Sequence, residues 1–190
     1  LRAVIQNAKS INMPKENIDR AIKKANDKNT ENYKEGLLEG YAPHGIAILV
    51  ETATDNNNRT VANIRSYFNK SNGNLGTAGS VEFMFDHVCN FRISDSNIDI
   101  EEIELEFIDY GVEEVFHDDD GILLYAPFEN FGEIQKELEK RGLSIVSTDI
   151  ERIPKQTKQL DTSCYEEVMK LIEKIEEDDD VQNVYHNLEI

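Results

Sequence analysis

Cysteine, proline and tryptophan are scarce in this chain: its 190 residues include two Cys, four Pro and no Trp. Cys89 and Cys164 lie far apart, which matches neither a disulfide framework nor a Cys-x-x-Cys metal knuckle, so we expect two buried thiols in a reducing compartment. The sequence also lacks an apolar run of the ~20 residues that a membrane helix needs, and it shows no leader of a secreted protein. We therefore expect a cytoplasmic protein that is neither inserted in a membrane nor secreted.

Positive charge is the second scarce feature, and it is unevenly placed. The chain has 20 Lys+Arg against 38 Asp+Glu, a formal net charge of −18. The net charge is +3 over residues 1–36, −1 over 37–94, −14 over 95–153 and −6 over 154–190. Because an acidic surface repels a polyphosphate, any contact with nucleic acid is expected at the N-terminal segment, with the acidic middle facing elsewhere.

Apolar residues at helical spacing open the chain and predict two amphipathic helices. Pro14 suits the first turn of the second helix, where a backbone N–H needs no partner, so Asn12 and Met13 form the break between the helices. Beyond Asn26 the periodicity is lost, and residues 27–35 are expected to be a linker. The apolar stripes are formed by Leu1, Val4, Ile5, Ala8 and Ile11, and by Ile18, Ala21, Ile22 and Ala25.

The rest of the chain alternates short apolar runs with helical patterns, which predicts an α+β fold. The expected elements up to residue 94 are strands at 37–42 and 46–54, a helix from the turn at 55–58 to about 69, a glycine-rich loop at 71–80, and an antiparallel pair of strands at 81–85 and 88–93. Those after it are a helix at 98–109, a hairpin of 112–116 and 122–126, a helix over 131–138 that Gly142 closes, a strand at 143–153, a helix over 165–175 and a strand at 181–188.

This order of elements suggests two ferredoxin-like α+β layers, the second inserted into the first. The expected domains are a helical domain at 1–35, an α+β domain formed by 36–94 and 154–190, and an acidic α+β domain at 95–153.

Motifs for catalysis, metal binding and cofactors are missing from the sequence. The glycines of the 71–80 loop match neither a P-loop nor a dinucleotide loop, and the loop leads into a strand, which favours a structural turn. The four histidines stand singly, without the spacing that places metal ligands on one face. The Asp118–Asp120 run lacks the register of a calcium loop and favours a solvated turn. We expect no enzyme, no metal and no cofactor.

The basic helix faces are the strongest candidate for a binding surface. Arg20 and Lys24 lie at i, i+4 with Lys23 adjacent, and although such faces are often merely solvated, this chain concentrates its few cations there. We predict sequence-independent phosphate contacts by these residues, extended by cations and a loop of the next domain. The predicted contacts are Lys9, Lys15, Arg20, Lys23 and Lys24, then Arg59, Arg65 and Lys70, and the loop residues Asn72, Gly73, Asn74 and Gly76.

Five separated sequence motifs resemble those of a known protein family, which composition alone does not indicate. They are LRAVIQNAK at 1–9, NMPKENIDRAIKK at 12–24, EGYAPHG at 39–45, TDNNNRT at 54–60, and GNLG at 73–76 leading to GSVEFMF at 79–85. Together they resemble the YebC/PmpR family of bacterial regulatory proteins, whose mitochondrial relatives are translational activators of cytochrome oxidase synthesis. The resemblance is strongest to about Phe85.

The resemblance implies a three-domain protein, with a small helical domain and two α+β domains, that lacks the family's basic N-terminal segment. It implies a DNA-binding transcriptional regulator or, alternatively, a translation factor on the ribosome, where the same cations meet ribosomal RNA. Neither function is catalytic, and neither involves a membrane or a small-molecule substrate. A third alternative, a protein-interaction module whose acidic domain binds a basic partner, also stays open.

Overall fold

The computed structural model describes residues 2–25, 33–94, 99–118 and 120–189. Contacts divide the chain into two compact units. The first unit consists of Leu1–Thr30 and His87–Arg152, and the second of Glu31–Asp86 and Ile153–Ile190. The fold is α+β, as the sequence predicts, with one four-stranded sheet in each unit.

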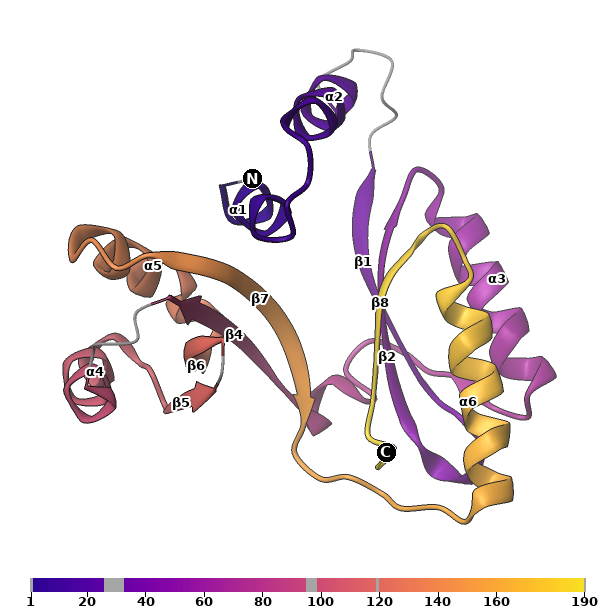
Figure 1. The fold of residues 1–190 in the computed structure, drawn as a ribbon. Coiled ribbons are helices and arrows are strands. Elements are labelled where there is room, and N and C mark those ends of the chain that lie inside the picture. Colours follow the sequence, from indigo (N-terminus) through magenta and orange to yellow (C-terminus); the bar gives the residue numbers. More distant parts are fainter. Residues whose placement is uncertain (1, 26–32, 95–98, 119, 190) are drawn as a thin grey trace. The chain divides into compact units, whose positions relative to one another are not determined.

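The sheet of the second unit is built around a hairpin. Strands β1 (Lys34–Tyr41) and β2 (Ala47–Thr54) pair antiparallel from Lys34↔Thr54 to Tyr41↔Ala47. The short strand β3 (Asn74–Leu75) and strand β8 (Val181–His186) complete the order β3-β1-β2-β8. Helices α3 (Asn57–Lys70) and α6 (Thr162–Glu176) lie side by side on one face of this sheet (Figure 1). Short 3-10 turns η1 (Pro43–Gly45) and η2 (Glu82–Met84) complete the unit.

The sheet of the first unit has the order β5-β6-β4-β7. Its strands are β4 (Phe85–Ile93), β5 (Glu114–Asp118), β6 (Gly121–Pro127) and β7 (Ile145–Pro154). Helix α4 (Ile100–Phe107) with turn η3 (Ile108–Tyr110) connects β4 to β5, and turn η4 (Phe128–Asn130) with helix α5 (Phe131–Lys140) connects β6 to β7. This is the split β-α-β arrangement of ferredoxin-like folds. The sheet of the second unit also packs against two helices, but its two central strands are the β1–β2 hairpin.

Helices α1 (Arg2–Ser10) and α2 (Lys15–Ala25) are separated by the break expected at Asn12 and Met13. Asn12 has a left-handed backbone with φ of 57°, and the Met13 N–H donates to the Ala8 carbonyl at 2.9 Å. These two features form a left-handed helix ending, after which Pro14 precedes the first turn of α2.

Each unit has its own hydrophobic core. In the first unit Phe91, Leu124 and Ile134 belong to the cluster that packs the sheet against α4 and α5. In the second unit Phe68 and Ile172 belong to the cluster between the sheet and its two helices. A smaller cluster around Leu49 lies on the other face of β2, where Val81 and Phe85 cover it.

Four expectations differ from the structure, and three of them concern pairing. The expected strand pair 81–85 and 88–93 is wrong: Glu82–Met84 is a 3-10 turn, and Phe85–Ile93 is one strand. That strand lies between β6 and β7, so residues 87–94 pair within the first unit's sheet. Asn74 and Leu75 form a strand inside the expected loop because they pair with β1. Cys89 is buried as expected, whereas Cys164 is only half-buried.

No helix within the described ranges is long and apolar enough to cross a membrane.

Candidate nucleic-acid interface

Helix α1 is held to the first unit's sheet by polar side chains. The Asn7 side chain donates to the Thr148 carbonyl at 2.7 Å and accepts from the Thr148 N–H at 3.0 Å, and the Gln6 amide donates to the Ile145 carbonyl. Strand β7 is an outer strand of the sheet, so its outward N–H and C=O groups need partners. The side-chain amide of Asn7 supplies one donor and one acceptor, as a neighbouring strand would. α1 therefore covers part of this sheet edge.

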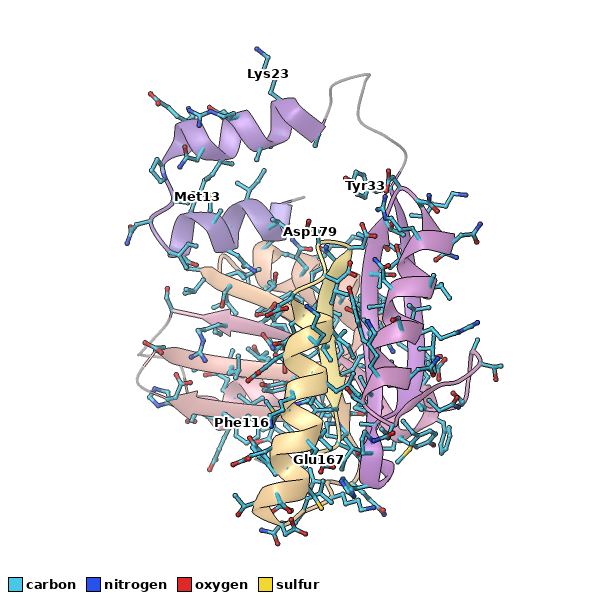
Figure 2. The ribbon with its side chains drawn as sticks, turned by 90° about the vertical axis from the view of Figure 1, so that its right-hand side faces the viewer. Met13, Lys23, Tyr33, Phe116, Glu167 and Asp179 are labelled. Carbon is cyan, nitrogen blue, oxygen red and sulfur yellow. The ribbon has the colours of Figure 1, made fainter. Side chains whose placement is uncertain are left out.

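The predicted phosphate contacts of the helical segment lie on exposed positions. Lys9 in α1 and Lys15, Arg20 and Lys23 in α2 are all exposed, and Lys23 projects away from its helix in Figure 2. Ile18, on the opposite stripe of α2, is only 8% exposed. α2 therefore buries Ile18, with Ile22 half-buried, and presents cations outward, while Ala21 and Ala25 of the expected stripe are exposed. The side chain of Lys24 lies outside the described residues.

Lys9 has a carboxylate of another helix in its neighbourhood. It lines a shallow hollow beside α1, together with Glu139 of α5 and Ser144 before β7. A carboxylate in the same hollow weakens the attraction of Lys9 for a phosphate. Acidic residues also lie beside the cations of α2, where Glu16 precedes Arg20 by four positions.

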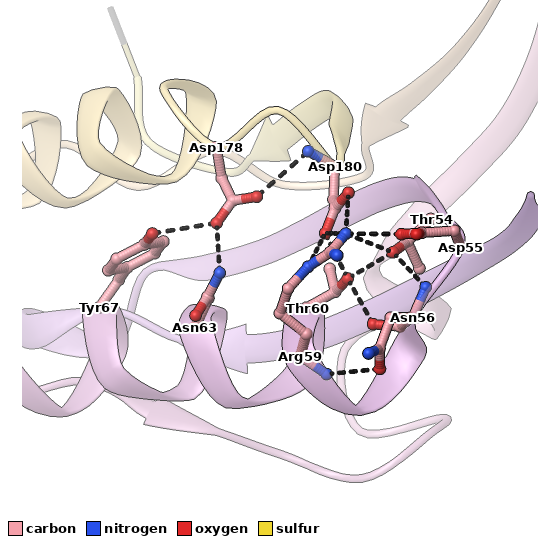
Figure 3. A network of polar contacts seen from close by, with 9 residues as sticks. All are labelled: Thr54, Asp55, Asn56, Arg59, Thr60, Asn63, Tyr67, Asp178 and Asp180. Atoms are coloured by element: carbon pink, nitrogen blue, oxygen red, sulfur yellow. Dashed lines mark hydrogen bonds and ion pairs between the residues drawn. The ribbon is translucent and has the colours of Figure 1, made fainter.

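Arg59, a predicted contact in the second unit, is bound within the chain (Figure 3). Its Nη2 lies 2.9 Å from a carboxylate oxygen of Asp180 and 2.7 Å from one of Asp55. The hydrogen bond to Asp180, then that to Asp55, raises the pKa of Arg59. These two carboxylates offset the charge that Arg59 would offer to a phosphate.

Asp180 lies at the centre of this network and is only 7% exposed. Burial by itself raises the pKa of Asp180, but hydrogen bonds from Thr60, Arg59 and Thr54 outweigh burial and hold the pKa below its usual value. The Thr60 hydroxyl donates to Asp180 at 2.7 Å, and the Asp180 carbonyl accepts from the Ala53 N–H at 2.9 Å. The network joins the start of α3 to the turn before β8.

A second carboxylate of the same turn binds further along α3. Asp178 accepts from the Tyr67 hydroxyl at 2.9 Å and from the Asn63 amide at 3.2 Å (Figure 3). Burial, followed by the bond to Asp178, raises the pKa of Tyr67. With Asp179 exposed beside them, the hollow at this end of α3 is lined mainly by carboxylates, an environment that disfavours an anion.

Arg65 and Lys70 form a separate small basic area on the second unit. Both are exposed on the outer face of α3, where they line a shallow depression with Ala62, Ser66 and Asn69. Lys70 lies in the last turn of α3, where the helix dipole favours a cation. These two residues are exposed, and Arg59 is exposed as well but paired with carboxylates of the chain.

The glycine-rich loop is organised by a carboxylate of the chain itself. Glu39 in β1 is 4% exposed and accepts from the N–H groups of Gly79, Val81 and Glu82 at 2.6, 2.7 and 2.8 Å. The loop thus forms an anion-binding turn that Glu39 occupies.

The N–H groups of the loop residues predicted to contact nucleic acid are engaged as well. The Gly73 N–H donates to the Phe68 carbonyl at 2.8 Å, and that of Gly76 donates to the Glu39 carbonyl at 2.7 Å. Of the loop residues predicted as contacts, Asn72 and Asn74 have exposed side chains.

Sequence reasoning overlooked two residues that organise these surfaces, although the sequence carries a signal for one. Glu39 interrupts the apolar run from Leu37 to Tyr41, and a charged residue inside a strand predicts a buried acceptor with specific donors. Asn7 has no comparable signal, because its partner Thr148 is distant in sequence.

No group of three His, Cys, Asp or Glu side chains is placed to hold a metal ion in the part of the chain that the structure describes.

Comparison with known proteins gives a consistent result along the chain. The family model described as "TACO1/YebC second and third domain" matches residues 33–188. A probable transcriptional regulatory protein of Flavobacterium psychrophilum is 70% identical over 189 residues, covering 100% of this chain and 80% of the relative. A protein of the same name from Porphyromonas gingivalis is 56% identical, with 99% and 78% covered. The crystal structure of a conserved hypothetical protein from Aquifex aeolicus superposes with a TM-score of 0.74 at 38% identity, covering 100% of this chain and 79% of that one.

Proposed function

The chain belongs to the TACO1/YebC family, and from this premise we propose that it is a transcriptional regulator that binds DNA through helices α1 and α2. The relatives' shared name, probable transcriptional regulatory protein, supports the regulatory role. The proposed function is non-catalytic, and its expected place is the cytoplasm.

The observation that carries the proposal is the contrast between two sets of cations. Lys15, Arg20 and Lys23 are exposed on α2, which is anchored by the buried Ile18. Arg59, by contrast, is bound by Asp180 and Asp55. α2 is therefore the part of this acidic chain best suited to meet phosphates.

The proposed contacts are with the phosphate backbone, so they position the protein without reading base sequence. Lys9, Lys15, Arg20, Lys23 and Lys24 make these contacts in our proposal. Arg65 and Lys70, with the side chains of Asn72 and Asn74, form a second, weaker contact area on the other unit. Arg59, Gly73 and Gly76 act mainly by holding α3 and the loop in place.

The test is titration of the protein against a labelled DNA duplex over a range of salt concentrations, comparing wild type with Lys15→Glu/Lys23→Glu. We expect the variant to bind at least about tenfold more weakly at low salt, and the slope of log K against log salt to fall by about 0.9 for each phosphate that the variant no longer neutralises. The matched control is Lys34→Glu/Lys170→Glu, which reverses two exposed lysines of the second unit. Equal weakening by both double variants would contradict a localised DNA surface.

Ribosomal RNA is the alternative target, and the same variants distinguish it. Sedimentation with purified ribosomes, before and after nuclease treatment, gives the second readout. Loss of ribosome binding in Lys15→Glu/Lys23→Glu, together with no binding of wild type to duplex DNA, would replace DNA by RNA as the proposed partner.

A further inference from the structure

Helix α4 carries large apolar side chains on two opposite faces. Ile103 and Phe107 are 2% and 0% exposed in the core of the first unit, whereas Leu105 and Ile108 are 74% and 61% exposed. A helix with one buried stripe normally turns polar residues outward. Leu105 and Ile108 are i, i+3 neighbours, and the backbone of Ile108 continues the helical conformation of α4. They therefore lie next to each other on the outward face.

Carboxylates flank this apolar pair along the helix. Glu101 precedes Leu105 by four residues, Glu104 precedes Ile108 by four, and Asp109 follows Leu105 by four. Positions four apart are neighbours on a helix surface, and all three side chains are exposed. We call the outward face formed by these five residues the α4 ridge.

Two cations at the end of α5 are engaged by carboxylates outside this face. Lys140 and Arg141, at the end of α5, both contact Glu137, and Arg141 also pairs with Glu106. The Arg141 guanidinium lies 5.0 Å from the centre of the Phe107 ring, beneath the buried side of α4. Residues 95–153, to which the ridge belongs, have a net charge of −14. The ridge thus combines an exposed apolar pair with strongly negative surroundings.

We propose that the α4 ridge binds a lysine- or arginine-rich amphipathic segment of a partner protein. Leucine-like side chains of that segment would contact Leu105 and Ile108, and its cations would meet Glu101, Glu104 and Asp109. Nucleic acid is repelled by this charge, so the occupant is a basic protein. The surface is independent of the DNA-binding surface proposed for α2, and its small apolar area corresponds to a weak, transient interaction.

The experiment measures binding of three labelled peptides to the full chain by fluorescence anisotropy. The first is a 15-residue helical peptide of Leu and Lys with its leucines on one face, the second is a scrambled version of it, and the third has Glu in place of Lys. We expect wild type to bind the first peptide at least about fivefold more tightly than the scrambled one and not to bind the third. Leu105→Ser/Ile108→Ser should remove that preference, because only the charge attraction is left.

Charge is tested separately with Glu101→Gln/Glu104→Gln, which should weaken both lysine peptides and reduce the salt dependence of binding. The matched controls are Phe83→Ser, at an exposed apolar residue of the second unit, and Glu166→Gln/Glu173→Gln on the exposed side of α6. Neither control should change the affinity of the first peptide by more than about twofold. Circular dichroism checks that each variant folds.

Two results would overturn the proposal. If the controls weaken the first peptide as much as the ridge variants do, binding reflects overall charge and not the ridge. If sedimentation equilibrium of the protein alone shows a dimer that Leu105→Ser/Ile108→Ser dissociates, the occupant of the ridge is a second copy of this chain.

Discussion

Glu39 places a negative charge in the buried part of strand β1, and the structure shows what makes this favourable. Three backbone N–H groups, of Gly79 in the glycine-rich loop and of Val81 and Glu82 just after it, point at its two carboxylate oxygens. Hydrogen bonds to an ionised acceptor in a buried position are stronger than neutral ones, and leaving such donors unmatched is costly. Glu39 therefore fixes the loop that leads into η2 and β4.

We predict that Glu39→Ala destabilises the second unit by about 3 kcal/mol or more, because three buried or half-buried donors lose their acceptor. Glu39→Gln should cost less, since its amide retains one acceptor oxygen. Urea unfolding followed by circular dichroism measures both effects. Glu166→Ala, an exposed carboxylate on α6, is the control and should stay within about 0.5 kcal/mol of wild type. A Glu39→Ala protein as stable as the control would show that water replaces the carboxylate.

Three helices of this protein begin at side-chain caps that the sequence displays. Asn56 accepts from the Arg59 N–H at the start of α3, Asp99 caps α4, and Asp161 caps α6. The Asp161 carboxylate accepts from the Cys164 N–H at 2.9 Å and from the Ser163 hydroxyl at 2.8 Å. These bonds, that of the Cys164 N–H first, lower the pKa of Asp161 from 3.8 to about 2.

The lowered pKa of Asp161 gives a pH-dependent prediction for α6. A carboxylate whose pKa is lower in the folded state stabilises that state above its unfolded pKa, and this stabilisation is lost as pH falls toward the folded value. We therefore expect the stability advantage of wild type over Asp161→Asn to shrink between pH 4 and about pH 2. Asn also caps helices but does not titrate there, so thermal melts of the two proteins across this range isolate the charge. A constant difference would assign the effect to other carboxylates.

Strands are harder to predict from the sequence than helices, because a strand forms only where another strand pairs with it. The helix at 98–109 and the hairpin of 112–116 and 122–126 follow from local periodicity and are found close to their expected bounds, apart from residue 98, which lies outside the described residues. The sequence from Val81 to Ile93, in contrast, contains Asp86 and His87, which imitate a turn. The continuous strand β4 forms there because β6 and β7 bind it from both sides.

The two units with separate cores lead to a prediction for the whole molecule. Phe91 and Phe68 are both fully buried, the first in the core of the first unit and the second in the main core of the second. Replacing either by Ala lowers the free energy of unfolding by about 3–5 kcal/mol, because buried packing is lost. We expect Phe91→Ala to increase amide hydrogen exchange in residues 87–152 and Phe68→Ala to increase it in 33–86 and 153–189, each leaving the other region protected. Equal acceleration of both regions in either variant would mean that the chain unfolds as one cooperative unit.

Much about this protein is determined by the sequence alone. The α+β class, the two opening helices, the acidic middle and the family follow from local patterns, because helical periodicity, capping residues and charge are read from neighbouring positions. The placement of Arg20 and Lys23 opposite Ile18 follows in the same way from the 3.6-residue period.

Only the tertiary structure decided which charges are exposed to a partner. Asp180 is 121 positions from Arg59 in the sequence, and only the fold brings the two side chains together. Glu39 is an ordinary acidic residue until the loop N–H groups converge on it, and Leu105 is an ordinary helix residue until the packing of Phe107 turns it outward. Long-range contacts set these outcomes because burial and ion pairing depend on the distance between side chains in space, which sequence separation does not give.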